Sequence, residues 1–173
     1  MKYVLAFFAA FLAAVLAASV MPHVHVLGVT PDLVLILAAC WAMVRGHQEA
    51  MVVVPMAAIV RDLTTSDPVG TSVLALAPIV LLAFAVRELR PVESEFLPAL
   101  LVVAATSLAY SIISMTVLTV VGDDVPWGRA LLLVTLPLML VNPLFAVLVY
   151  PPIRWLSRRP RRESFGVGSA VQL

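Results

Sequence analysis

Long apolar stretches separated by short polar segments make up most of this chain. A helix needs roughly 20 apolar residues to cross the hydrocarbon core of a bilayer, and somewhat fewer suffice when flanking residues reach toward the headgroups. Six stretches meet this description: Tyr3 to Met21, Leu33 to Val44, Ala50 to Val60, Val73 to Val86, Phe96 to Val121 and Ala130 to Tyr150. The pattern therefore predicts an all-α, polytopic membrane bundle of about six transmembrane helices.

The second and third stretches are the shortest, with 12 and 11 uninterrupted apolar residues. The second becomes longer if residues 24–30 join it, and the third must then include Arg61 and Asp62. Alternatively, the two stretches together form a thin or re-entrant hairpin. The sequence alone leaves both arrangements open.

Composition agrees with a membrane protein. The chain has 173 residues, of which 62% are hydrophobic, and its mean hydropathy is +1.08. A soluble domain of this length cannot bury so much apolar surface. The single cysteine, Cys40, excludes a disulfide framework and a cysteine-based metal site. We expect a transmembrane bundle over residues 1–157 and a basic cytoplasmic tail over residues 158–173, which lies against anionic headgroups.

The positions of Lys and Arg predict the orientation, because cytoplasmic loops near membrane ends carry an excess of positive charge. With six spans and a cytoplasmic N-terminus, the extracytoplasmic side holds only Arg61 and Arg129. The cytoplasmic side holds nine basic residues: Lys2, Arg45, Arg87, Arg90, Arg154, Arg158, Arg159, Arg161 and Arg162. Residues 1–19 also have features of a signal peptide, but the long apolar core favours a retained first helix. Both termini are therefore expected in the cytoplasm.

Few residues carry the pattern of a catalytic or metal site. His23 and His25 have a spacing that suits metal ligation, but two ligands are too few for zinc. Asp123 and Asp124 are neighbours on a short loop, where a solvated turn is expected. No Gly-x-Ser-x-Gly or His-Glu-x-x-His motif occurs. We therefore expect no enzymatic activity, no catalytic or metal-binding residues and no cofactor.

Hydroxyl-bearing side chains recur at helical spacing along the fifth predicted span. They are Thr106, Ser107, Tyr110, Ser111 and Ser114. Such a stripe lets helices approach closely and hydrogen-bond across the contact, although a path for a polar substrate has the same pattern. Helix packing is the favoured interpretation.

Arg61 and Asp62 are the strongest candidates for a functional role, because ionisable residues at a membrane boundary are costly unless they are paired, hydrated or buried against a partner. Neighbours on a helix point about 100° apart, so the two do not simply pair with each other. Arg61 is expected to reach outward, or toward Asp32 or Asp67. The alternative is a hydrated helix end, followed by a turn in which Pro68 and Gly70 end one helix and begin the next.

Several of these features occur together in residues 31–86. A Pro-Asp pair opens an apolar helix, and a later helix ends in Asp before a Pro-x-Gly turn and a further apolar helix. The residues involved are Pro31-Asp32, Trp41-Ala42, Arg45-Gly46, Asp62-Leu63 and Asp67-Pro68-Val69-Gly70. In this combination the segment, about a third of the chain, resembles the family of the rod-shape-determining membrane protein MreD.

That resemblance implies a non-enzymatic scaffold of the cell-elongation and peptidoglycan-synthesis machinery in the bacterial inner membrane. It implies binding to the bitopic membrane protein MreC, and support of the actin-like MreB and of the synthase RodA with its class B penicillin-binding protein. The bilayer is the other expected partner, and no nucleic acid is expected. The partner-binding or structural residues implied are Asp32, Arg61, Asp62, Asp67, Pro68 and Gly70.

Two other functional classes remain as alternatives. The outline is also similar to the substrate-binding S components of energy-coupling-factor vitamin transporters, in which Arg61 and Asp62 would belong to a small-molecule pocket. Few aromatic or polar residues within the spans are available to line such a pocket. An intramembrane enzyme of the lipoprotein signal peptidase type is disfavoured, because the only asparagine, Asn142, is remote from the acidic residues in sequence.

Overall fold

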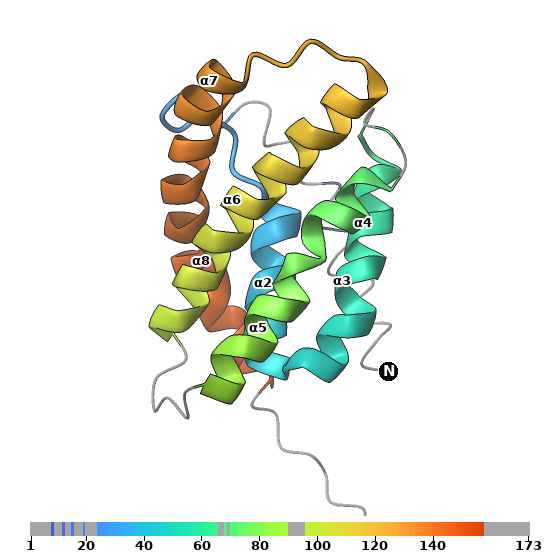
Figure 1. The fold of residues 1–173 in the computed structure, drawn as a ribbon. Helices are drawn as coiled ribbons and strands as arrows, with labels where there is room; N and C mark the ends of the chain where they lie inside the picture. Colours follow the sequence, from blue (N-terminus) through green and yellow to red (C-terminus); the bar gives the residue numbers. More distant parts are fainter. Residues whose placement is uncertain are drawn as a thin grey trace, which may run out of the picture.

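The computed structural model describes residues 24–65, 68, 70–89 and 96–157, together with Phe8, Leu12, Val15 and Ser19. Within these ranges the chain is helical, and its β-type pairing is an isolated bridge between Val26 and Val29. The helices pack side by side into a single bundle (Figure 1). The predicted all-α class is therefore confirmed for the described residues.

The first pair of described helices forms a tight hairpin. Helix α2 (Leu33–Arg45) begins at Asp32, whose side chain accepts a hydrogen bond from the Leu35 amide. It ends at Gly46, whose backbone φ of 90° and ψ of 170° belong to a region that favours glycine. Helix α3 (His47–Asp62) follows immediately and contains Pro55.

The chain then turns back through two shorter helices. Helix α4 (Thr71–Leu76) begins after Gly70, which has a left-handed conformation, and helix α5 (Pro78–Leu89) continues it after Ala77. Proline has no backbone N–H to give to the preceding turn, which explains the break between the two helices at Pro78.

The last two long helical stretches form a second hairpin. Helix α6 (Phe96–Val121) ends at Gly122, where φ is 107°. After a short loop, α7 (Trp127–Ala130), the π-helical turn η2 (Leu131–Thr135) and α8 (Leu136–Ser157) form one continuous helical stretch. Pro143, Pro151 and Pro152 lie inside α8.

Two of these stretches, Phe96–Val121 and Trp127–Ser157, are long and apolar enough to cross a membrane. The predicted count of six transmembrane helices is not confirmed. The second and third predicted spans become helices of 13 and 16 residues, and the fourth is interrupted at Ala77. Each of the two arrangements left open for the short spans is met in part: α2 does not extend into residues 24–30, while α3 includes Arg61 and Asp62.

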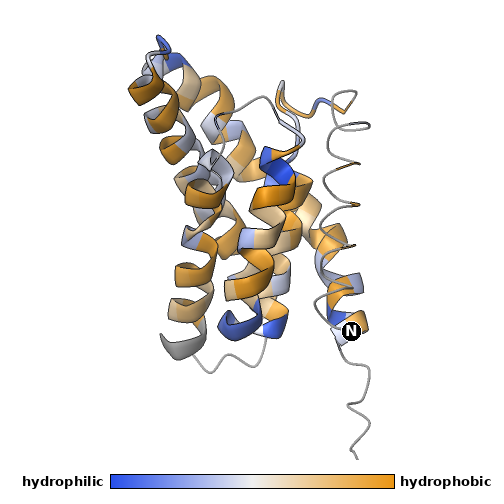
Figure 2. Cartoon of the chain, turned by 90° about the vertical axis from the view of Figure 1, so that its right-hand side faces the viewer, coloured by the Kyte–Doolittle hydropathy of each residue, from blue (hydrophilic) through white to orange (hydrophobic). Residues whose placement is uncertain are grey.

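Helix α2 forms the centre of the bundle. It contacts α3, α5, α6 and α8, and its residues from Val34 to Met43 are almost all buried. The surrounding helices bury smaller faces and leave large apolar side chains exposed on the outside. Figure 2 shows the apolar helix bodies, with polar residues mostly near helix ends and loops. This distribution fits a bundle with a lipid-compatible surface.

Several predictions concern residues outside the described ranges. The first predicted span, Tyr3 to Met21, lies outside them except for four positions, which are helical and exposed. His23, Asp67 and the tail from residue 158 onward also lie outside.

Candidate functional site

Arg61 and Asp32 form an ion pair between the end of α3 and the start of α2. The Arg61 Nη1 atom donates to Asp32 Oδ2, and both side chains are largely buried. The other carboxylate oxygen, Oδ1, accepts from the Leu35 amide at 3.1 Å and so caps α2. The Asp32 carboxylate thus caps α2 and also neutralises Arg61. Of the directions considered for Arg61 from the sequence, the structure shows the one toward Asp32.

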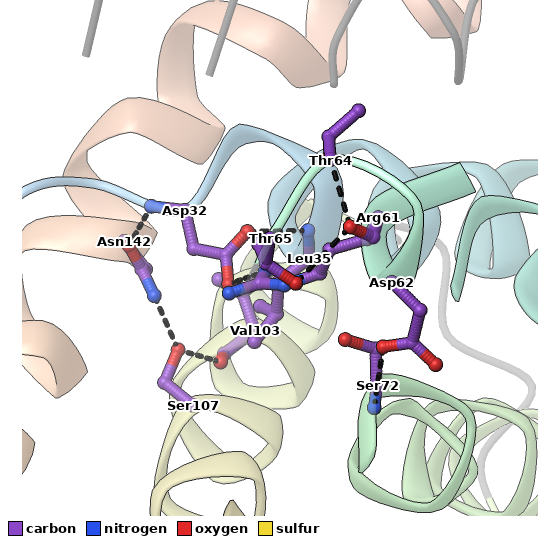
Figure 3. Close-up of polar contacts among 10 residues, drawn as sticks. All are labelled: Asp32, Leu35, Arg61, Asp62, Thr64, Thr65, Ser72, Val103, Ser107 and Asn142. Carbon is purple, nitrogen blue, oxygen red and sulfur yellow. Dashed lines mark hydrogen bonds and ion pairs between the residues drawn. The ribbon is translucent and has the colours of Figure 1, made fainter. Parts of the chain in front are cut away.

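Asn142 of α8 extends this pair to two more helices (Figure 3). Its Oδ1 accepts from the backbone amide of Asp32 at 3.0 Å, and its Nδ2 donates to Ser107 Oγ of α6 at 2.9 Å. Ser107 in turn donates to the Val103 carbonyl at 2.8 Å. Asn142 and Ser107 are both about 1% exposed. We call Asp32, Arg61, Ser107 and Asn142 the polar centre, because together they join α2, α3, α6 and α8.

Asp62 has a different role from its neighbour. Its Oδ2 accepts from the Gly70 amide at 2.7 Å, and its Oδ1 accepts from the Ser72 amide at 3.1 Å. The carboxylate, only 7% exposed, therefore satisfies amides at the start of α4, where negative charge also complements the helix dipole. The left-handed conformation of Gly70, with φ of 96°, directs its amide into this contact.

Further contacts fix the end of α3. The Arg61 guanidinium lies 4.6 Å from the centre of the Tyr110 ring on α6, a cation–π distance. The hydroxyls of Thr64 and Thr65 donate to the Arg61 carbonyl at 2.9 and 3.2 Å. Arg61 is thereby held through both its side chain and its main chain.

Most of the residues implied by the family resemblance contact one another at the ends of α2, α3 and α4. Asp32 and Arg61 form an ion pair, and the Asp62 carboxylate accepts a hydrogen bond from the backbone amide of Gly70. The Pro68 carbonyl accepts from both the amide and the hydroxyl of Thr71, at 3.1 and 2.7 Å. Asp67 lies outside the described residues. The motif residues that are described therefore act in two adjoining helix-capping arrangements.

Asn142, Ser107 and Tyr110 were not among the site residues chosen from the sequence. A signal for Asn142 was present, because a lone amide within a long apolar helix requires a buried hydrogen-bond partner. Ser107 and Tyr110 belong to the hydroxyl stripe, of which Thr106, Ser107 and Ser111 are buried. The sequence did not indicate which of these hydroxyls would meet Asn142.

The chemistry available at this site is mainly that of fixed hydrogen bonds and one ion pair. Both carboxylates are directed at amides or at Arg61. In the ranges that the structure describes, no three side chains of His, Cys, Asp or Glu gather as a metal site would require. His25 and the pair Asp123–Asp124 are exposed on loops. This geometry is suited to fixing the positions of the helix ends at the start of α2 and of α4.

No protein-family model, curated protein or solved structure matches this chain significantly. The likeness of residues 31–86 to the MreD family therefore rests on the residues themselves.

Proposed function

We propose that this protein is a non-enzymatic membrane scaffold of the MreD type. In this proposal it belongs to the cell-elongation machinery of the bacterial inner membrane, crosses the membrane several times with both termini in the cytoplasm, and binds an MreC-type bitopic partner. MreB, RodA and a class B penicillin-binding protein are the further expected partners.

One observation carries the proposal: the polar residues of the MreD-like segment are used to fix backbone positions. Asp32 caps α2 and pairs with Arg61, while Asp62 holds the start of α4. A scaffold needs this kind of rigidity, because its partner recognises a surface whose shape must not change. In the S-component alternative the same side chains would contact a small molecule, whereas here the polar atoms of Asp62 contact the protein itself.

The proposed mechanism has two parts. The apolar exterior of the bundle accepts the partner's single membrane helix, since apolar helices associate through close packing in lipid. Residues 61–70, called the braced segment because the Asp62 carboxylate accepts from the Gly70 amide at its far end, contact the partner near where its chain leaves the membrane. Asp62 holds Gly70 in place and therefore acts as a positioning residue.

The proposal is tested by affinity purification from native membranes in mild detergent, with mass spectrometry of the proteins and small molecules that accompany the chain. Recovery of an MreC-like bitopic protein, with or without the elongation synthase, supports the scaffold. Recovery of an ATPase module or a bound vitamin instead supports a transport component and overturns the proposal.

A variant then tests the part played by the braced segment. Asp62→Ala should reduce recovery of the MreC-type partner while the bundle remains folded, which is checked by gel filtration in detergent. Asp124→Ala is the matched control, because Asp124 is also acidic but is exposed on the loop between α6 and α7. Unchanged recovery with a folded Asp62→Ala protein would show that this segment has no part in partner binding.

A further inference from the structure

The helices of the bundle have unequal lengths. At about 1.5 Å per residue, α2 with 13 residues and α3 with 16 residues are about 20 and 24 Å long. By the same measure α6, with 26 residues, is about 39 Å long, and the 31 residues from Trp127 to Ser157 extend about 46 Å. The hydrocarbon core of a bilayer is about 30 Å thick. Within the described residues, both helical stretches of the second hairpin exceed this thickness, whereas α2 and α3 do not.

The polar centre lies near the middle of these long helices. Asn142 is 15 residues from Trp127 and 15 residues from Ser157. Ser107, its partner on α6, is 11 residues from Phe96 and 14 from Val121. Because Asn142 also binds the Asp32 amide, the start of α2 is held at this same height. Figure 1 shows α6 and α7 extending beyond the ends of α2 and α4.

The turn that follows α3 adds a second, independent observation. Leu63, Thr64 and Thr65 are all exposed, with Leu63 at 80%, and they form a non-helical turn next to Arg61. Within a membrane, non-helical backbone is tolerated where protein buries it or where it contacts water, because hydrocarbon cannot accept its hydrogen bonds. The amides of this turn donate to the carbonyls of Ile59 and Arg61. The turn and its two threonines nevertheless face outward and are not covered by protein, and contact with water is what makes such an exposed polar turn tolerable within a membrane.

We infer that water enters the bundle from the side of the loop at residues 122–126 and reaches the Arg61–Asp32 ion pair, which lies within the membrane below the ends of α6 and of the stretch from α7 to α8. This inference rests on the membrane location in the proposed function, but not on any partner. The water lies above the start of α2 and the end of α3, beside α6 and the longer stretch from α7 to α8. Such hydration explains how a charged pair persists at this depth, since solvent reduces the cost of ionised groups within a bilayer.

Single cysteines test this inference directly. In a Cys40→Ala background, Thr64→Cys and Thr65→Cys place thiols on the exposed turn. Leu140→Cys and Leu144→Cys are the matched controls, because each lies two residues from Asn142 and is exposed on α8, at 67% and 60%. Asp124→Cys reports full access from the loop side. The probe is a membrane-impermeant maleimide applied to membrane vesicles of each orientation.

The turn cysteines should react from the side that labels Asp124→Cys, at least about tenfold faster than the cysteines on α8, because the reacting thiolate forms in water and is suppressed in hydrocarbon. Turn cysteines that react as slowly as Leu140→Cys would overturn the inference. Equal, fast reaction of all positions would overturn it as well, by placing α8 in water. The assay needs no partner, so these outcomes are separate from a failure of co-purification.

Discussion

At the scale of single residues, neighbouring charges have distinct partners. Arg61 meets Asp32 and the Tyr110 ring, whereas Asp62 meets two amides at the start of α4. This separation follows from helix geometry, because adjacent side chains point about 100° apart. Arg61 and Asp62, which are adjacent in the sequence, therefore have separate structural roles: Arg61 pairs with the start of α2, and Asp62 caps the start of α4.

Loss of the Asp62 carboxylate should destabilise the start of α4. Asp62→Ala leaves two amide donors without their acceptor, and we expect it to cost about 1–2 kcal/mol. Asp62→Asn keeps one acceptor oxygen and should lose less. Thermal unfolding in detergent, followed by gel filtration, should show stability decreasing from wild type to Asp62→Asn and then to Asp62→Ala. Equal stability of all three proteins would show that the cap contributes nothing.

The Arg61–Asp32 pair is tested by a double-mutant cycle. Asp32→Asn keeps an oxygen for the Leu35 amide but leaves the Arg61 charge unmatched, and Arg61→Met leaves the Asp32 charge unmatched. Removing one partner of a buried pair leaves an uncompensated charge, at a cost of about 3–5 kcal/mol in a dry interior. Because water reaches this pair, each single change should cost less than that. The double variant should lose clearly less than the sum of the two.

Stability of the four proteins is compared by chemical or thermal unfolding in the same detergent. Strict additivity of the two losses would mean that the charges act independently, in contradiction to the ion pair.

At the scale of helices, apolar patterning predicted much of the architecture. The run from Phe96 to Val121 matches α6 at both ends, because nothing interrupts it before Gly122. The same patterning predicted six spans, of which the described residues confirm two as long enough to cross a membrane. Hydrophobicity does not distinguish a helix buried among protein neighbours, such as α2, from one that crosses lipid. The polar centre was predicted in part: Asp32 and Arg61 were singled out, but pairing with Asn142 depends on a contact between residues 110 positions apart.

The hairpin between α2 and α3 depends on Gly46. Its φ of 90° and ψ of 170° are accessible to glycine but strained for other residues, so Gly46→Ala should cost about 1–3 kcal/mol. Gly128→Ala is the matched control, because Gly128 lies in α7 and an added Cβ would meet no atom within 4 Å. Unfolding temperatures in detergent should fall for Gly46→Ala and stay the same or rise for Gly128→Ala. A larger fall in unfolding temperature for Gly128→Ala than for Gly46→Ala would contradict the expected strain at position 46.

At the scale of the whole molecule, four helices meet at one level through the polar centre. Buried hydrogen bonds between helices have defined geometry, so they fix the relative height of the helices in a way that apolar packing alone does not. The consequence is a bundle whose short helices are held at a set depth against the two long ones.

The proposed topology predicts which side of the membrane each hairpin faces. Gln48, at the start of α3, should be cytoplasmic, while Asp124, between α6 and α7, should be extracytoplasmic. In a Cys40→Ala background, Gln48→Cys should be labelled by an impermeant maleimide only in inside-out vesicles, and Asp124→Cys only in right-side-out vesicles. Labelling of both positions from one side would contradict the proposed topology.

The contact between Asn142 and the Asp32 amide also has a consequence for synthesis of the chain. Arg61 follows Asp32 by 29 residues, whereas Asn142 follows it by 110. At about 5–20 residues per second, the ribosome needs about 4–16 s to proceed from Arg61 to Asn142. Both members of the ion pair are therefore synthesised seconds before Asn142. During this interval the two charges have only each other, without the Asn142 side chain that later holds the start of α2 in place.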